Sequence, residues 1–80
     1  MTKREKLIQK ILKGDTNISP EEAMKILINL GYVATPPSGG SSHITFRKFN
    51  SMPITLVLTQ NPLKPYMITK LQTALKNEGY

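Results

Sequence analysis

The chain has 80 residues, with 11 lysines and arginines against 5 aspartates and glutamates, so its formal net charge is +6 at neutral pH. It has no cysteine and a single histidine, which excludes disulfide bonds, thiolate metal sites and imidazole clusters. A chain of this length is expected to fold as one small domain that buries about 60% of the surface of its extended form. The excess of positive charge favours a partner that carries phosphate groups.

No apolar run approaches the roughly 20 residues of a membrane-spanning helix. The first residues, Met1 to Lys6, lack the apolar segment of a signal peptide. We therefore expect a cytoplasmic protein without membrane contacts. The acidic residues show no paired spacing around a glycine-rich loop, so neither a metal site nor a small-molecule cofactor is expected.

The N-terminal segment, residues 3–14, is predicted to form a basic helix that ends at Gly14. Its apolar residues share one helical face and its lysines share another. The apolar set is Leu7, Ile8, Ile11 and Leu12, and the lysine set is Lys3, Lys6, Lys10 and Lys13. The lysine stripe could follow a phosphate backbone, but a solvated helix face gives the same pattern, and we favour the solvated interpretation.

Residues 19–80 are predicted to form the core of the domain, which begins with a second helix. Ser19 is suited to the N-cap, Pro20 to the first helical position, and Glu22 completes a capping box. Gly31 supplies the left-handed residue that ends the helix. Its core side is predicted to be Ala23, Met24, Leu27 and Leu30, with Ile26 and Ile28 widening the apolar surface. Either this helix packs on two sides, or part of it binds another chain.

Three strands are expected after the second helix, at residues 32–35, 43–49 and 54–58. A loop rich in proline, glycine and serine separates the first two strands, and a turn at Asn50 and Ser51 separates the last two. Connections this short favour antiparallel pairing, so the three strands should form a meander.

The second strand alternates between apolar and polar residues. Ile44 and Phe46 should face the core, whereas His43, Thr45 and Arg47 should lie on the opposite, open face of the sheet.

A last helix is predicted to begin at Pro65. Its inner side is formed by Ile68, Leu71, Ala74 and Leu75. The element order α-α-β-β-β-α predicts an α+β fold, in which helices pack on one face of a three-stranded antiparallel sheet and leave the other face exposed.

His43 lies where the glycine-serine loop becomes a strand, which suits it to proton transfer near neutral pH. In RNA cleavage the ribose 2′-hydroxyl attacks the adjacent phosphorus, no metal is required, and an imidazole can act as general base or acid. Arg47 on the same face could balance the charge that grows on the phosphate oxygens, and the amides of Gly40, Ser41 and Ser42 could orient the phosphodiester. A lone histidine at a strand edge is also a common surface residue, so a non-catalytic binding surface stays open.

Three segments of the chain resemble the HicA toxins, which are bacterial mRNA interferases. They are residues 27–32, 40–47 and 64–68, and the resemblance extends from about residue 6 to residue 80. It implies a single HicA-like domain over residues 1–80 with a fold similar to double-stranded-RNA-binding domains. It also implies ribosome-independent cleavage of mRNA and neutralisation by a HicB-type antitoxin protein.

The resemblance also assigns roles to particular residues. His43 corresponds to the catalytic histidine and Gly40 to the conformationally important glycine of the same loop. Lys64 and Tyr66 correspond to the segment at the start of the last helix, where a helix N-terminus favours phosphate. Many HicA proteins carry a second histidine after the third strand, and residues 54–59 contain none. The group that acts as the second acid or base is therefore left open.

Our hypothesis from the sequence is a HicA-like endoribonuclease in which His43 moves the proton and basic residues, chiefly Arg47 and Lys48 with Lys64, hold the RNA. One alternative is a non-catalytic RNA-binding module that uses the same face. Another is an interaction domain whose apolar second helix and exposed sheet edge dock a partner protein.

Overall fold

The computed structural model describes residues 2–35 and 42–80. It contains the helices α1 (Lys3–Leu12), α2 (Pro20–Asn29) and α3 (Pro65–Asn77) and the strands β1 (Val33–Thr35), β2 (His43–Arg47) and β3 (Ile54–Val57). The predicted α+β class and the element order α-α-β-β-β-α are confirmed.

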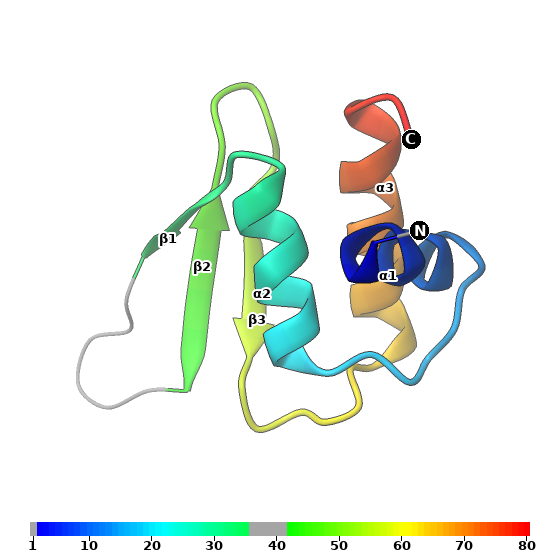
Figure 1. Ribbon diagram of the computed structural model, residues 1–80. Helices are drawn as coiled ribbons and strands as arrows, with labels where there is room; N and C mark the ends of the chain where they lie inside the picture. Colours follow the sequence, from blue (N-terminus) through cyan, green and yellow to red (C-terminus); the bar gives the residue numbers. More distant parts are fainter. Residues whose placement is uncertain (1, 36–41) are drawn as a thin grey trace.

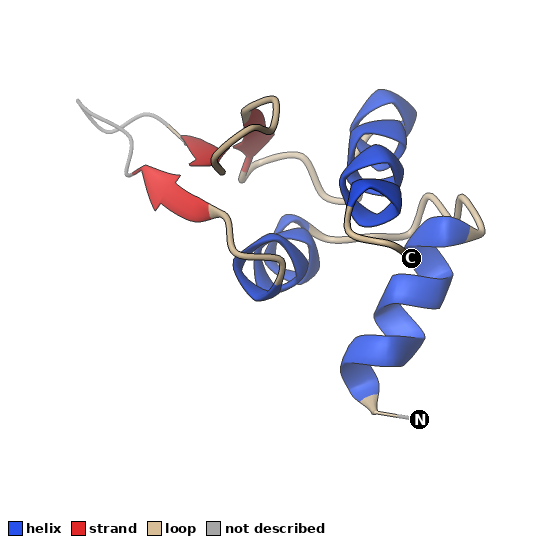
Figure 2. Ribbon diagram, turned by 90° about the horizontal axis from the view of Figure 1, so that it is seen from above, coloured by secondary structure: helices blue, strands red, loops and turns tan. Residues whose placement is uncertain are grey.

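The three strands form one antiparallel sheet in the order β1-β2-β3, as the short connections predicted. All three helices lie on the same side of this sheet (Figures 1 and 2). α2 packs against β1 and β3, and α1 packs on the outside of α2 and α3. The described helices therefore cover one face of the sheet and leave the other uncovered.

The predicted signals at both ends of α2 are present in the structure. The Ser19 hydroxyl accepts a hydrogen bond from the Glu22 amide at 3.2 Å, and the Ser19 amide donates to the Glu22 carboxylate at 3.0 Å. At the other end Gly31 has φ +97°, and the Tyr32 amide donates to the Leu27 carbonyl at 3.0 Å. This 6→1 hydrogen bond is typical of a Schellman motif, and it keeps Tyr32 with the helix end, so that β1 begins at Val33.

The core lies between the sheet and the helices. Its largest fully buried side chains are Ile11, Ile18, Ile26, Leu27, Phe46, Leu56, Leu63, Met67, Leu71 and Leu75. The buried residues Ile18 and Leu63 come from loops, which periodicity could not predict. The Leu63 amide donates to the Ile18 carbonyl at 2.8 Å, and this bond joins the loop between α1 and α2 to the loop between β3 and α3.

The predicted inner side of α2 is confirmed, with differences in the depth of burial. Ala23 and Leu27 are buried, and Met24 and Leu30 are partly buried and pack against the core. Ile26, which was expected only to widen the apolar surface, is a full member of the core. Ile28, by contrast, is 60% exposed. α2 therefore packs along a single stripe, and its second apolar side faces outward.

No helix within residues 2–35 and 42–80 has the length and apolar character needed to cross a bilayer. The same residues contain no group of three or more histidine, cysteine, aspartate or glutamate side chains that could hold a metal ion.

Candidate functional site

The uncovered face of the sheet is the candidate functional site. Strand register gives its side chains as Val33 and Thr35 from β1, His43, Thr45 and Arg47 from β2, and Thr55 and Val57 from β3. The predicted alternation of β2 is confirmed, because Phe46 is buried while His43 and Arg47 are exposed. We call this set the open face.

His43 begins β2 and lies opposite Val57 of β3. Directly before it, the Ser42 carbonyl accepts a hydrogen bond from the Leu58 amide at 2.9 Å. In an antiparallel ladder this bond makes His43 and Val57 a non-hydrogen-bonded pair. The two side chains of such a pair lie closer together than those of a hydrogen-bonded pair. The backbone that carries the imidazole is thus held by β3 at the point where the strand starts.

Thr45 lies between His43 and Arg47 on the open face. Its hydroxyl oxygen is 3.1 Å from that of Thr55 on β3, so one hydroxyl donates to the other. Arg47 is four positions after His43 along the strand, which corresponds to about 13 Å between their Cα atoms. The two residues share a face as predicted, but they stand at opposite ends of β2 and would contact different parts of a bound nucleic acid.

Lys48 does not belong to the open face. It turns inward after β2, and its ammonium donates to the Leu30 carbonyl and pairs with the Glu78 carboxylate. The same ammonium lies 5.8 Å from the centroid of the Tyr32 ring. The structure thus assigns Lys48 to the packing of β2 against α2 and α3, because an inward-pointing side chain after Phe46 reaches those helix ends.

Lys64 and Tyr66 lie at the start of α3. Lys64 occupies the N-cap position without a side-chain capping bond, and both residues are exposed. The Lys70 ammonium lies 5.8 Å from the centroid of the Tyr66 ring, one helical turn further along. In Figure 1 α3 begins at the same end of the molecule at which β2 begins, so this segment shares an end with His43.

The predicted phosphate-orienting loop is described only at its last residue. Ser42 is half-buried, with its carbonyl bonded to β3 as stated above. Gly40 and Ser41 lie outside the described residues.

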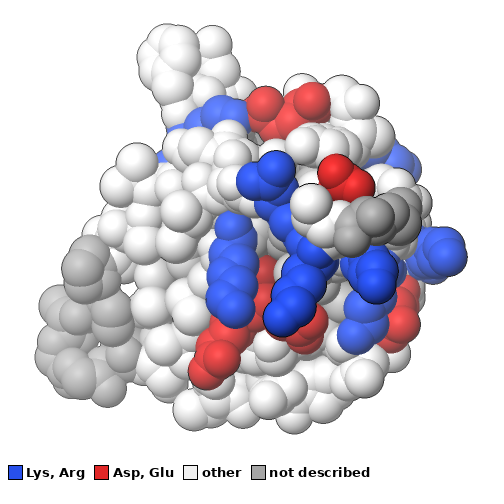
Figure 3. All heavy atoms as spheres, viewed as in Figure 1, with Lys and Arg blue, Asp and Glu red and all other residues white. Residues whose placement is uncertain are grey.

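Much of the positive charge lies away from the open face. Figure 3 shows lysine and arginine side chains gathered over the face that α1 and α2 present, with acidic side chains among them. A groove between α1 and α2 is lined by Lys3, Arg4 and Lys25 but also by Glu22. This mixture of signs agrees with a solvated helix surface. Arg47 is the cation that the described part of the chain contributes to the open face.

Exposed apolar side chains near Arg47 were not singled out by the sequence. Val33 pairs with Arg47 across the sheet and is 69% exposed, and Phe49 and Met52 in the β2–β3 hairpin are 90% and 82% exposed. The signal that could have found them is the break in alternation after Arg47, where apolar residues fall in a turn.

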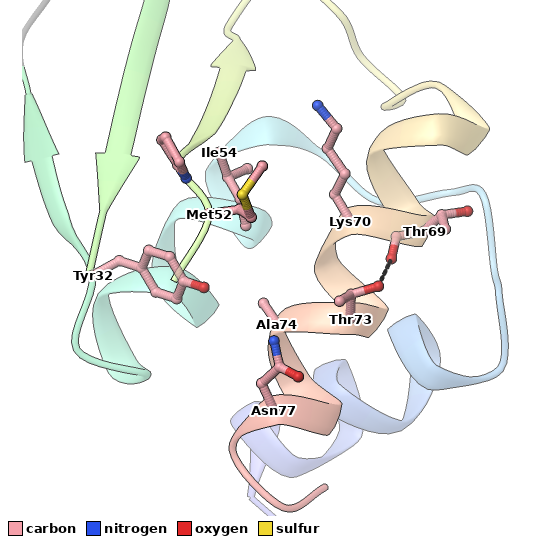
Figure 4. A pocket seen from close by; sticks show the side chains of 9 residues that line it. Tyr32, Met52, Ile54, Thr69, Lys70, Thr73, Ala74 and Asn77 are labelled. Carbon is pink, nitrogen blue, oxygen red and sulfur yellow. Dashed lines mark hydrogen bonds between the residues drawn. The ribbon is translucent and has the colours of Figure 1, made fainter. Parts of the chain in front are cut away.

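A groove of about 260 Å³ lies between this hairpin and α3. In Figure 4 Tyr32, Met52 and Ile54 approach it from the sheet side, and Lys70, Thr73 and Asn77 approach it from α3. The Thr73 hydroxyl donates to the Thr69 carbonyl at 3.1 Å, so it is satisfied within the helix. The groove is at the Arg47 end of the sheet and is separate from His43.

The fold and the site define a small basic α+β protein whose antiparallel sheet has one covered face and one open face bearing an exposed histidine at a strand start. No family model, curated protein or solved structure matches this chain.

Proposed function

We propose that this chain is a HicA-like toxin, a metal-independent endoribonuclease that cleaves mRNA with His43 as general base or acid. The proposal includes a fold of the double-stranded-RNA-binding-domain type, a cytoplasmic location and a HicB-type antitoxin as partner. The observation that carries it is the exposed position of His43 at the start of β2, on backbone that a hydrogen bond to β3 holds in place.

In the proposed reaction the imidazole accepts the proton of the ribose 2′-hydroxyl while that oxygen attacks the adjacent phosphorus. The bond from phosphorus to the 5′-oxygen breaks, and the products are a 2′,3′-cyclic phosphate and a 5′-hydroxyl. The 5′-oxygen must gain a proton as it leaves, and the group that supplies it is not assigned. General acid–base catalysis of this kind contributes about 10²- to 10⁴-fold to the rate.

Charge supports an RNA substrate. The net charge of +6 attracts a polyanion, and Arg47 lies on the same face as the imidazole. Because Arg47 is at the far end of β2, it would hold a phosphate next to the reacting one rather than the reacting phosphate itself. At the end of the molecule where β2 begins, Lys64 at the start of α3 offers an exposed positive charge.

Cleavage of RNA by the purified chain in the presence of EDTA tests the proposal. His43→Ala should lower the cleavage rate by about 10²-fold or more while RNA binding is largely kept. A substrate with a single 2′-deoxyribose at the cleaved position should bind and remain intact. Ile28→Ala, a change at an exposed position of α2 away from the open face, is the control and should retain cleavage.

Equal activity of the wild-type chain and His43→Ala would remove His43 from the mechanism. Cleavage that EDTA abolishes would contradict a metal-independent reaction. RNA binding without any cleavage would favour the second candidate, a non-catalytic RNA-binding module. The separation of His43 from Arg47 along β2 supports that candidate, because a binding face does not require a cation beside the reacting phosphate.

A further inference from the structure

The end of the sheet that carries Arg47 has an apolar surface that the cleavage proposal does not use. Val33, Phe49 and Met52 are 69%, 90% and 82% exposed, and we call these residues the hairpin patch. Single exposed apolar side chains are common on soluble proteins. Here three occur at one end of one sheet, beside an exposed arginine, and the most exposed is an aromatic ring.

Phe49 stands on a fixed turn. The Ser51 amide donates to the Lys48 carbonyl at 3.0 Å, which places Phe49 and Asn50 at the two central positions of a β-turn. Asn50 has φ 62°, as the third position of a type II turn requires. Because the Lys48 side chain is bonded inward to Leu30 and Glu78, the residue after it is held outward.

No part of the described chain receives the Phe49 ring. The neighbouring groove is lined by Met52 from the hairpin, but Phe49 is not among its lining residues (Figure 4). The turn fixes the backbone that carries this 90% exposed ring, and a phenylalanine has only two rotatable side-chain bonds, so ordering the ring against a ligand costs little conformational entropy.

The charge beside the ring points to the chemistry of the ligand. Arg47 is exposed two residues before Phe49, and the Glu78 carboxylate at the end of α3 is paired with Lys48. A ligand that fits both neighbours has a flat π surface and a negative charge attached to it. A nucleotide within a strand has both.

We propose that Phe49 stacks against an unpaired base of single-stranded RNA while Arg47 binds the adjacent phosphate. This inference rests on the proposed function and adds the class of substrate. A duplex keeps the faces of its bases stacked on one another, whereas a single strand can splay a base onto an aromatic side chain. The RNA would run along β2, from Phe49 toward the bond beside His43.

A single tryptophan can report this contact, because the chain contains no tryptophan. In Phe49→Trp, the fluorescence should be quenched on titration with a short single-stranded RNA and much less with a duplex of the same sequence. Ile28→Trp, at a 60% exposed position on α2, is the matched control and should not respond.

Removal of the ring should weaken binding. Loss of one base–aromatic stack corresponds to about 5- to 150-fold in affinity for single-stranded RNA. Phe49→Ala should therefore raise the Kd and KM for single strands with little change in kcat, Phe49→Tyr should restore both, and Ile28→Ala should change neither. The thermal midpoint of Phe49→Ala should match the wild type, because the ring is 90% exposed.

The inference is overturned if Phe49→Ala binds single-stranded RNA as tightly as the wild type, or if Phe49→Trp responds equally to duplex. Loss of binding to a protein partner with unchanged RNA affinity would also overturn it and make the hairpin patch a protein-docking surface. If single-stranded RNA quenches the fluorescence of Phe49→Trp but the wild-type chain cleaves no RNA, the stacking site is supported and the nuclease proposal fails. If His43→Ala loses cleavage but the fluorescence of Phe49→Trp does not respond to RNA, the nuclease proposal is supported and the stacking site fails.

Discussion

Lys48 and Glu78 form an ion pair that joins the end of β2 to the residue that caps α3. Lys48 also donates to the Leu30 carbonyl at the end of α2, so one ammonium connects three elements. We expect Glu78→Gln to lower the free energy of unfolding by about 0.5–1 kcal/mol, as for a partly exposed ion pair. Lys48→Met should lower it by about 1–2 kcal/mol, because the Leu30 carbonyl also loses its donor.

Urea unfolding of both variants measures these differences. RNA binding of Glu78→Gln at several salt concentrations distinguishes the structural role of Lys48 from a phosphate contact. An unchanged salt slope is expected. A slope that steepens when the carboxylate is removed would indicate that Lys48 is released to bind phosphate.

Ile26 and Ile28 provide a matched pair on one helix. Their exposed fractions are 1% and 60%. Ile26→Ala should lower the free energy of unfolding by about 2–4 kcal/mol, because it removes buried methyl groups and leaves a cavity. Ile28→Ala should change it by less than about 0.5 kcal/mol. Denaturant unfolding of the two variants checks this. Similar losses at the two positions would mean that the outer side of α2 is covered by another chain.

Gly31 connects α2 to β1 with φ +97°. A Cβ at this position would meet only the Lys48 side chain, at 3.6 Å, so space is available and the backbone conformation decides the cost. Gly31→Ala should destabilise the protein by about 1–2 kcal/mol. Gly31→Asn should lose less stability than Gly31→Ala, because asparagine tolerates the left-handed region. Thermal unfolding of both variants gives the comparison, and equal losses would point to a steric rather than a conformational cause.

Arg47 is expected to hold a phosphate on the open face. Arg47→Gln should weaken RNA binding and reduce the magnitude of the salt slope, d log K/d log[salt], by about 0.7–1, the value for one lost phosphate contact. Lys6→Gln removes the same charge from the exposed surface of α1 and serves as the control. Filter binding at four or five salt concentrations measures both slopes. Equal reductions would show that charge acts at long range rather than through a contact at Arg47.

Local patterns in the sequence were sufficient for the elements and for one face of β2. Ser19, Pro20 and Glu22 define the start of α2 through atoms at most three residues apart, and Gly31 defines its end. The alternation from His43 to Arg47 predicted which side chains are exposed, because successive strand residues point to opposite faces whatever the strand pairs with.

Contacts between distant parts of the chain could not be predicted in the same way. How deeply the apolar residues of α2 are buried depends on the line along which the helix meets the sheet, which leaves Met24 and Leu30 partly buried and Ile26 fully buried. The partners of Lys48 are 18 and 30 residues away along the chain. From the sequence alone, a lysine that follows a strand is predicted to be a surface charge. Its inward position becomes clear only when the helix ends that lie beside it are known.

The sequence by itself therefore determined the class of fold, the ends of the helices and the exposure of His43, since each follows from backbone geometry over a few neighbouring residues. Only the tertiary structure decided that a threonine pair lies between His43 and Arg47, that Lys48 is held inward and that Phe49 is almost fully exposed. Those features depend on strand register and on the packing of helices against the sheet, which arise from contacts across the whole domain.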